Sequence, residues 1–146
     1  MTIRSRLQES VALQRNYFLL AVAFFTRIPI PANTPFSAER LNHASRYFSL
    51  VGWIVGLCAA LSLLLAYQLF PISIAVLISM SVSIKITGAF HEDGLADMSD
   101  GLGGGMSQER KLEIMKDSRL GTYGALALLL AVLIKSVALY EITQLG

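Results

Sequence analysis

Charged residues are scarce in this chain of 146 residues, where Asp, Glu, Lys and Arg together make up 15% of the total. Soluble proteins carry roughly 25%. The formal net charge is only +2, and no basic stripe with interleaved aromatic residues occurs, so we expect no nucleic-acid partner. The single cysteine, Cys58, excludes an intramolecular disulfide. The polar N-terminus also lacks the compact apolar core and cleavage site of a signal peptide.

Hydrophobic residues make up 54% of the chain, and many of them form long apolar runs. Three segments, residues 48–70, 72–90 and 122–140, are long enough to cross a hydrocarbon core of about 30 Å, which takes roughly 20 helical residues. Only Pro71 separates the first two, so they are predicted to form a helical hairpin with a tight turn. The sequence therefore predicts an all-α, polytopic membrane helix bundle in one domain, residues 1–146.

The distribution of basic residues predicts the orientation of this bundle. The hairpin places residues 31–47 and the motif loop, residues 91–121, on one side of the membrane, and both segments carry basic residues, whereas the turn at Pro71 carries none. The positive-inside rule puts them in the cytoplasm. A fourth apolar segment, Tyr17–Ile30, follows three arginines that would lie outside if it spanned. We therefore expect an interfacial or re-entrant helix there, ended by Pro29 and Pro31.

The acidic stretch HEDGLADMSDGLGGG, residues 91–105, follows directly on the second apolar segment. Asp93, Asp97 and Asp100 are spaced by four and three residues, so they share one face if the helix continues. Like charges at this spacing repel one another, and a hard divalent cation would neutralise them. Mg²⁺ commonly takes one or two carboxylates together with water and substrate phosphates. Gly94 and Gly101 would keep the face slim enough for a bulky ligand.

The alternative interpretation of the acidic cluster is a hydrophilic loop with capping aspartates. It explains one or two acidic residues, but not three on one face at the membrane surface beside a basic segment. That segment, RKLEIMKDSRLGTYG at residues 110–124, is predicted to form an amphipathic surface helix. Lys111 and Lys116 suit anionic lipid, while Arg119, next to Asp117, suits bidentate phosphate binding. Acids and bases at one interface favour metal-assisted phosphoryl transfer.

Two lysines lie within the predicted spans. Lys85 is near a helix end and can reach the headgroups by snorkelling. Lys135 either does the same or faces the bundle interior and meets an anionic substrate. Both interpretations of Lys135 are open at this point.

The two motifs together resemble the cobalamin synthase family. Its members carry a His-x-Asp-Gly-Leu-Ala-Asp-x-x-Asp-Gly pattern, followed by a segment like Ile-Met-Lys-Asp-Ser-Arg-x-Gly-Thr-Tyr-Gly. The stretches FFTRIPIP (residues 24–31) and YFSLVGWIVG (residues 47–56) are similar to further family segments, although Ser49 stands where proline is expected. The likeness covers nearly the whole chain, from about Phe18 to Tyr140.

The resemblance implies a Mg²⁺-dependent, multi-pass enzyme of the bacterial inner membrane with a cytoplasmic motif loop and lipid contacts. Such an enzyme joins adenosylcobinamide-GDP to α-ribazole, or to its 5′-phosphate, and releases GMP. Assembly into a homo-oligomer is left open. The chemistry of the residues and the resemblance together give the candidate site: metal ligands (Asp93, Asp97, Asp100 and Glu92), catalytic residues (Asp100 as base, Asp117 and Arg119) and substrate-binding residues (Arg119, Lys116 and Lys135). His91 is an alternative base.

One departure concerns length. Members of the family are longer and carry further spans after the third, so we expect this chain to be truncated relative to them. Two other functions are weighed. A CDP-alcohol phosphotransferase would show an Asp-Gly-x-x-Ala-Arg pattern, but here Asp97 follows Ala96. A transport subunit would place its acidic residues within the spans rather than in a loop. An inactive membrane fragment remains the alternative to a transferase.

Overall fold

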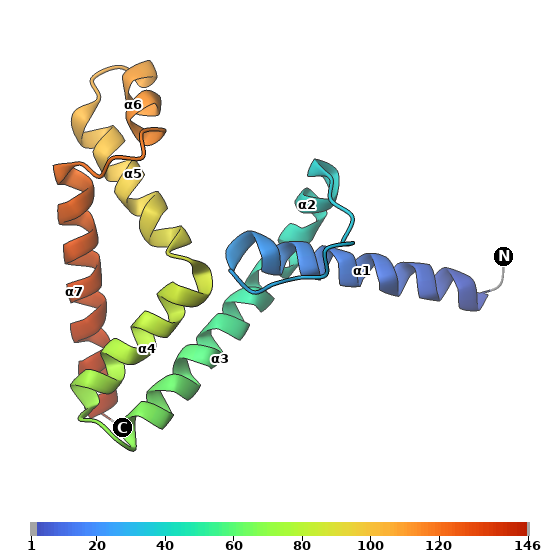
Figure 1. Cartoon of the computed structure of the whole chain (residues 1–146), viewed down its shortest axis with the longest axis horizontal. Helices are drawn as coiled ribbons and strands as arrows, with labels where there is room; N and C mark the ends of the chain where they lie inside the picture. The colour runs from blue at the N-terminus through green and yellow to red at the C-terminus, as the bar shows by residue number, and fades with distance from the viewer. Residues whose placement is uncertain (1–2, 146) are drawn as a thin grey trace.

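The structure, a computed structural model, describes residues 3–145, and within that range it contains helices and no strand. The elements in chain order are α1 (Ile3–Phe25), α2 (Ala38–Ala44), a 3-10 helix (Ser45–Tyr47), α3 (Phe48–Tyr67), α4 (Ile72–Thr87), α5 (Phe90–Gly104), α6 (Gln108–Met115) and α7 (Thr122–Gln144). Figure 1 shows α3, α4 and α7 in the lower part of the molecule and α5 and α6 above them. The all-α membrane bundle predicted from the sequence is confirmed.

The first two apolar segments form the expected hairpin. α3 ends at Tyr67 and α4 begins at Ile72, directly after Pro71, whose fixed φ and missing N–H suit the start of a helix. The Ser79 hydroxyl donates a 2.7 Å hydrogen bond across the hairpin to the carbonyl oxygen of Ala59. The small residues at this contact let the two backbones approach closely.

The second predicted span is shorter than expected. Two helical stretches, Ala38–Tyr67 and Thr122–Gln144, are each long and apolar enough to cross a membrane. α4 alone has 16 residues, or about 24 Å at 1.5 Å per residue, and the hydrocarbon core is about 30 Å thick. It reaches spanning length only together with α5, to which it is bent by 83°. The helix predicted over residues 72–90 therefore breaks before its end.

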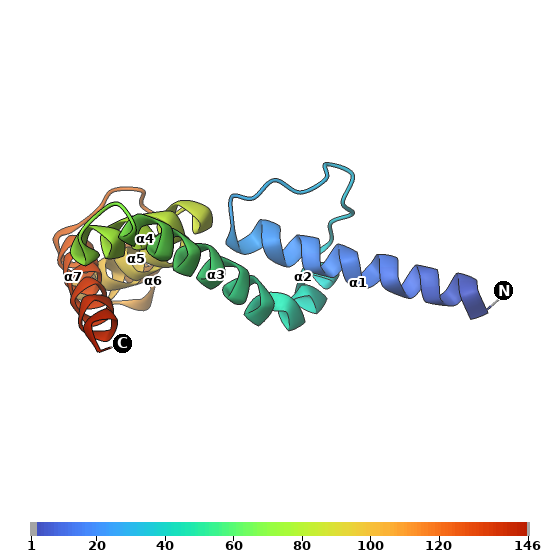
Figure 2. The same ribbon diagram turned by 90° about the horizontal axis from the view of Figure 1, so that it is seen from below.

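The N-terminal helix differs from the prediction in its bounds. α1 runs from Ile3 to Phe25 rather than from Tyr17 to Ile30, so it begins earlier and ends before either proline. The hydroxyl of Thr26 then bonds the carbonyl oxygen of Val22, and the chain arches away from α1 toward α2 (Figure 2).

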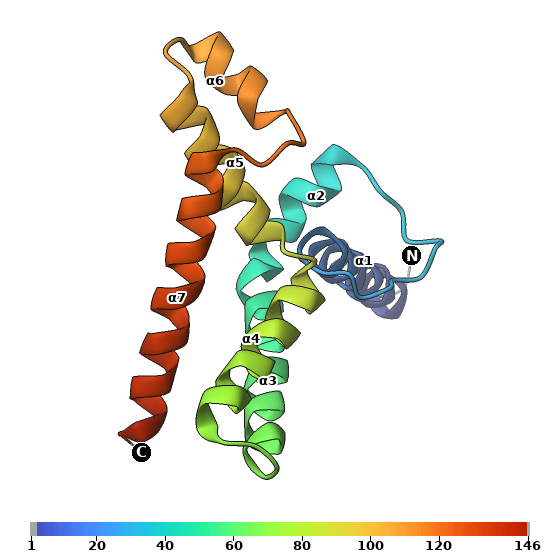
Figure 3. The same cartoon turned by 60° about the vertical axis from the view of Figure 1, so that its left-hand side comes forward.

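α1 lies across the α3–α4 hairpin rather than along it (Figure 3). Its buried residues Tyr17, Leu20 and Ala21 pack against Ala44 and Val51 at the start of the hairpin. By length and composition α1 is not among the stretches able to cross a membrane. This agrees with the interfacial position expected for the helix, which stays a prediction.

Large apolar side chains cover the outside of the bundle. On α7 alone, Leu126, Leu129, Leu130, Leu133, Ile134 and Val137 are all more than half exposed. A helix that is apolar on all sides suits a lipid surrounding. The outward faces of the long helices therefore have the composition expected of a surface that faces lipid.

Candidate functional site

The bend between α4 and α5 sets the direction of the acidic helix. Gly88 and Ala89 both adopt left-handed backbone angles, with φ of 64° and 61°. A Cβ atom at Gly88 would overlap the side chain of Arg27, whose backbone N–H donates a 2.7 Å hydrogen bond to the carbonyl oxygen of Ile86. The segment after α1 thus packs into the bend, where only glycine leaves room for it.

The acidic motif lies on a helix of its own, α5. Most of the segment predicted to join the spans, residues 91–121, is helical, and α6 includes part of the predicted amphipathic helix. Within α5, Asp93, Asp97 and Asp100 follow the four-then-three spacing that places them on one helix face. This part of the prediction is confirmed, although the helix is separate from the preceding span. Asp93 is exposed, Asp97 is half-buried and Asp100 is buried.

Asp100 holds the start of α7. Its carboxylate accepts a 2.7 Å hydrogen bond from the backbone N–H of Gly121 and a 2.8 Å bond from that of Gly124. Gly121 is the N-cap residue of α7 and has no side chain to cap the helix itself. The carboxylate supplies this cap from α5, and its negative charge meets the positive end of the helix dipole. Asp100 is only 8% exposed, so these bonds act away from water.

Two glycines make the cap sterically possible. A Cβ atom at Gly121 or at Gly124 would overlap the Asp100 carboxylate. Neither glycine was among the residues predicted for the site. Their signal in the sequence is the GTYG stretch, where two glycines open an apolar helix that lacks a capping side chain of its own.

Gly101 serves a purpose other than the one predicted. A Cβ atom there would overlap the side chain of Met115 on α6, and one at Gly103 would overlap the ring of Tyr123 on α7. The slim face at Gly101 is therefore filled by a neighbouring helix and leaves no room for a bulky ligand. The small residues of α5 allow α6 and α7 to pack closely against it.

Asp117 and Arg119 form a clasp in the link between α6 and α7. The Arg119 Nη2 atom lies 2.6 Å from Asp117 Oδ2, and its Nε atom lies 3.1 and 3.0 Å from the two carboxylate oxygens. These hydrogen bonds from Arg119 lower the pKa of Asp117, and the same contacts raise the pKa of Arg119. The Arg119 side chain is 86% exposed. Because Nη1 is not engaged by Asp117, it is available to another acceptor.

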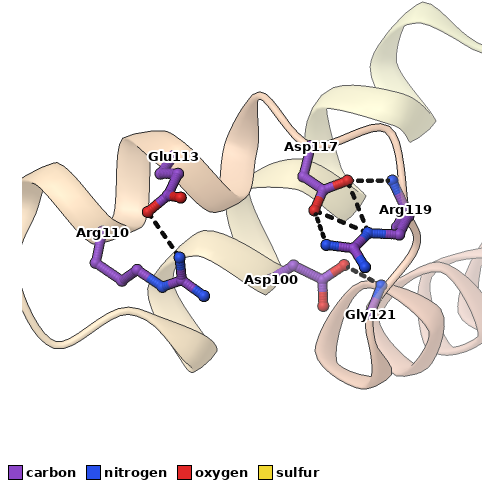
Figure 4. Close-up of polar contacts among 6 residues, drawn as sticks. All are labelled: Asp100, Arg110, Glu113, Asp117, Arg119 and Gly121. Carbon is purple, nitrogen blue, oxygen red and sulfur yellow. Dashed lines mark hydrogen bonds and ion pairs between the residues drawn. The ribbon is translucent and has the colours of Figure 1, made fainter.

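Figure 4 shows how the clasp lies relative to Asp100. The clasp of Asp117 and Arg119 lies beside Gly121, where the link reaches the start of α7 and the Asp100 carboxylate. Lys116 immediately precedes the clasp, as the exposed C-cap residue of α6. The first motif and the second motif of the sequence are thus adjacent in space, as their chemistry led us to expect.

Glu92 lines a cavity that none of the three aspartates lines. The cavity has a volume of about 370 Å³, and Lys135 of α7 also lines it. The Oε2 atom of Glu92 is buried and has no hydrogen-bond partner among the described residues. Two residues predicted for different roles, metal binding and substrate binding, therefore line the same cavity.

The donor set on α5 fits a divalent cation bound by two carboxylates. Within residues 3–145, no group of three or more His, Cys, Asp or Glu side chains is arranged to hold a metal ion. The side chains of Asp93 and Asp97 make no hydrogen bond or ion pair with any described residue, whereas both oxygens of Asp100 accept backbone N–H groups. Two free carboxylates one turn apart suit Mg²⁺, which usually completes its shell with water and substrate phosphates.

Comparison with known proteins identifies the family of this chain. Residues 17–145 match the family model described as cobalamin-5-phosphate synthase. Proteins named adenosylcobinamide-GDP ribazoletransferase are similar to the chain: that of Vibrio cholerae is 57% identical over 132 residues, covering 90% of this chain and 51% of the relative. That of Vibrio parahaemolyticus is 51% identical over 142 residues, covering 97% and 54%. That of Shewanella amazonensis is 56% identical over 134 residues, covering 88% and 52%.

The chain spans about half the length of these curated relatives. No solved structure matches it. Because the family model covers residues 17–145, including the acidic helix, the clasp and all three long apolar helices, the chain belongs to the cobalamin-5-phosphate synthase family.

Proposed function

We propose that this chain transfers the cobinamide phosphate of adenosylcobinamide-GDP to α-ribazole, or to its 5′-phosphate, and releases GMP. The observation that supports this most directly is the pair of hydrogen bonds that joins Asp100 to the start of α7. It holds the carboxylate face of α5 beside the segment that bears Arg119. Carboxylates and an arginine fixed at one junction suit transfer between phosphorylated substrates, which depends mostly on positioning and charge.

In the proposed reaction, the acceptor's hydroxyl oxygen bonds to the phosphorus nearer the cobinamide, and the bond from that phosphorus to the GMP oxygen breaks. GMP leaves with the electron pair of this bond, and the hydroxyl proton passes to a carboxylate on α5. Asp93 or Asp97, through the carboxylate oxygen that it does not give to a metal, suits this transfer better than Asp100, because both oxygens of Asp100 already accept backbone N–H groups. We therefore assign Asp100 to positioning rather than to proton transfer.

Asp93 and Asp97 are the residues that would hold Mg²⁺. When bound, this ion would neutralise charge on the diphosphate and bring it to the α5 face. Arg119 donates from Nη1 to a phosphoryl oxygen while Asp117 keeps the guanidinium in place through Nε and Nη2. Lys116, exposed at the end of α6, adds positive charge at the same approach.

The same proposal includes the placement of the chain in the cell. We place it in the bacterial inner membrane, with α5, α6 and the clasp on the cytoplasmic side, because the basic residues flanking the hairpin follow the positive-inside rule. The nucleotide substrate would then be drawn from the cytoplasm. The exposed apolar faces of α3 and α7 would contact lipid.

The test is an assay of the 146-residue chain in liposomes with adenosylcobinamide-GDP, α-ribazole and Mg²⁺, in which GMP and the cobamide product are both measured. We expect the two products to appear in equal amounts and to require the metal. The Vibrio cholerae relative, assayed in parallel, is the positive control. If that relative forms product and this chain forms none at any metal concentration, the proposal is wrong for this chain.

A further inference from the structure

The cavity that contains Glu92 is formed where four of the long helices and α5 meet. Five helices contribute to its lining. One lining residue from each of α1, α3, α4, α5 and α7 is, in that order, Phe25, Gly56, Thr87, Glu92 and Lys135. At about 370 Å³ it falls in the lower part of the size range of small-molecule sites. Such sites are mostly apolar and contain a few convergent polar groups, and this cavity has that composition.

The unpartnered oxygen of Glu92 points to a ligand that donates hydrogen bonds. A buried carboxylate oxygen without a partner is costly, because it has lost water and gained nothing in return. The ion pairs among the described residues are those of Arg110 with Glu113 and Arg119 with Asp117, so Lys135 does not neutralise Glu92. A hydroxyl or N–H group of a bound molecule would satisfy this oxygen.

Another part of the lining is aromatic and open. Phe25 packs edge-on against Phe48, with ring centroids 4.5 Å apart, and lies parallel to the ring of His91 at 5.9 Å. A Cβ atom added at Gly52 or Gly56 meets no atom within 4 Å. A flat ring can therefore lie along the glycines of α3 and against the aromatic side chains, which prefer stacked or edge-to-face contacts.

Lys135 gives the cavity one cationic group. It lies on α7, more than three turns beyond Gly121, within an otherwise apolar helix. An ionisable residue at such depth usually faces a functional cavity. Its ammonium group can pair with a phosphate on a ligand whose ring and hydroxyl groups are bound elsewhere in the cavity.

We propose that this cavity binds the acceptor, an aromatic heterocycle that carries a ribose. The ring lies between the α3 glycines and the aromatic side chains of α1 and α3, a ribose hydroxyl donates to Glu92, and Lys135 pairs with the 5′-phosphate when one is present. The inference rests on the proposed function for its substrate, and it separates the acceptor cavity from the diphosphate site on α5. Glu92 thereby becomes an acceptor-binding residue rather than a metal ligand.

The test measures binding and catalysis separately with the full chain in liposomes. Equilibrium dialysis with radiolabelled α-ribazole gives the dissociation constant, and GMP release gives KM for each substrate. The variant Gly56→Leu fills the cavity at a position with free space, and Ala60→Leu, one turn further along α3 and outside the lining, is its matched control. Lys135→Met removes only the ammonium group.

We expect Gly56→Leu to weaken binding of α-ribazole about tenfold or more while KM for adenosylcobinamide-GDP is unchanged. Ala60→Leu should bind α-ribazole like the unaltered chain. Lys135→Met should weaken binding of the 5′-phosphate about tenfold and leave that of the nucleoside unchanged.

Two results would overturn the assignment. One is a helical, membrane-inserted Gly56→Leu chain that binds α-ribazole with the original affinity. The other is an unaltered chain that takes up no α-ribazole at millimolar concentration. Failure of the proposed function has a different signature, because α-ribazole would then bind and respond to Gly56→Leu while no GMP was released.

Discussion

Asp100 and Gly124 are 24 residues apart in the chain, yet a 2.8 Å hydrogen bond joins the carboxylate of one to the backbone N–H of the other in the buried contact between α5 and α7. The bond makes the central acidic motif part of the framework that fixes the third long helix. A carboxylate that caps a neighbouring helix has a structural role which can be separated from catalysis by measurement.

Replacing Asp100 with Asn should lower the stability of the chain. The amide keeps the shape but loses the charge, and one of the two N–H groups at the start of α7 loses its acceptor, so we expect a cost of roughly 1–3 kcal/mol. Thermal unfolding in detergent, followed by circular dichroism, measures it. Asp93→Asn is the control on the same face, because Asp93 is exposed and makes no such bond, and equal losses in the two variants would contradict the capping role.

Gly124 and Gly94 should respond in opposite directions to substitution by alanine. At Gly124 the new Cβ overlaps the Asp100 carboxylate, whereas at Gly94 it meets nothing within 4 Å. Gly94→Ala should stabilise α5 by about 0.5–1 kcal/mol, because alanine is the better helix former, and Gly124→Ala should destabilise the chain. Thermal unfolding of both variants decides this, and a stable Gly124→Ala chain would show that Asp100 is free to move.

The Asp97→Asn variant should retain its fold and lose turnover. It removes one of the two free carboxylates proposed for Mg²⁺ without changing shape, and we expect GMP release to fall by at least about a hundredfold. The assay compares Asp97→Asn with Ser99→Ala on the same helix, and circular dichroism verifies helix content in each. Normal turnover in Asp97→Asn would remove the argument for a metal site on α5.

The clasp between Asp117 and Arg119 should open only when the pH falls below the ordinary pKa of an aspartate. Hydrogen bonds from Arg119 lower the pKa of Asp117 from 3.8. The stabilisation is therefore complete above the ordinary pKa and is lost as the pH falls through the lowered value. The carboxyl carbon chemical shift of Asp117, followed by NMR against pH in nanodiscs, reports this titration.

Arg119→Gln provides the comparison for that titration. Without the guanidinium, the pKa of Asp117 should rise toward its ordinary value, because the main cause of the shift is gone. If the carboxyl group of Asp117 has the same pKa with and without Arg119, the clasp does not persist in the membrane-bound protein.

Much of the fold could be predicted from hydropathy and spacing. The α3–α4 hairpin follows from two apolar runs separated by Pro71, and the shared face of the three aspartates follows from the helical repeat. The bend at Gly88 could not be predicted, because nothing local distinguishes that glycine from a packing residue. It depends on Arg27, which lies far away in the sequence and packs where a Cβ would be.

The site was predicted less completely than the fold. The pairing of Asp117 with Arg119 is local and could be expected from a spacing of two residues. The partners of Asp100 and the position of Glu92 depend on which helices meet, and one sequence without a structure does not contain that information. The sequence identified Glu92 as one acid among several, while its place in a cavity with Phe25 depends on the packing of α1 against α3 and α5.

Because Asp100 is hydrogen-bonded to the start of α7, we expect the position of the acidic helix to depend on the thickness of the bilayer. α7 has 23 residues, or about 35 Å of helix, and a helix longer than the hydrocarbon core tilts to match it. Since the first turn of α7 is bonded to α5, a change of tilt must move Asp93 and Asp97 with it or break the bond. We therefore expect lipids of different acyl length to change the geometry of the carboxylates through hydrophobic mismatch.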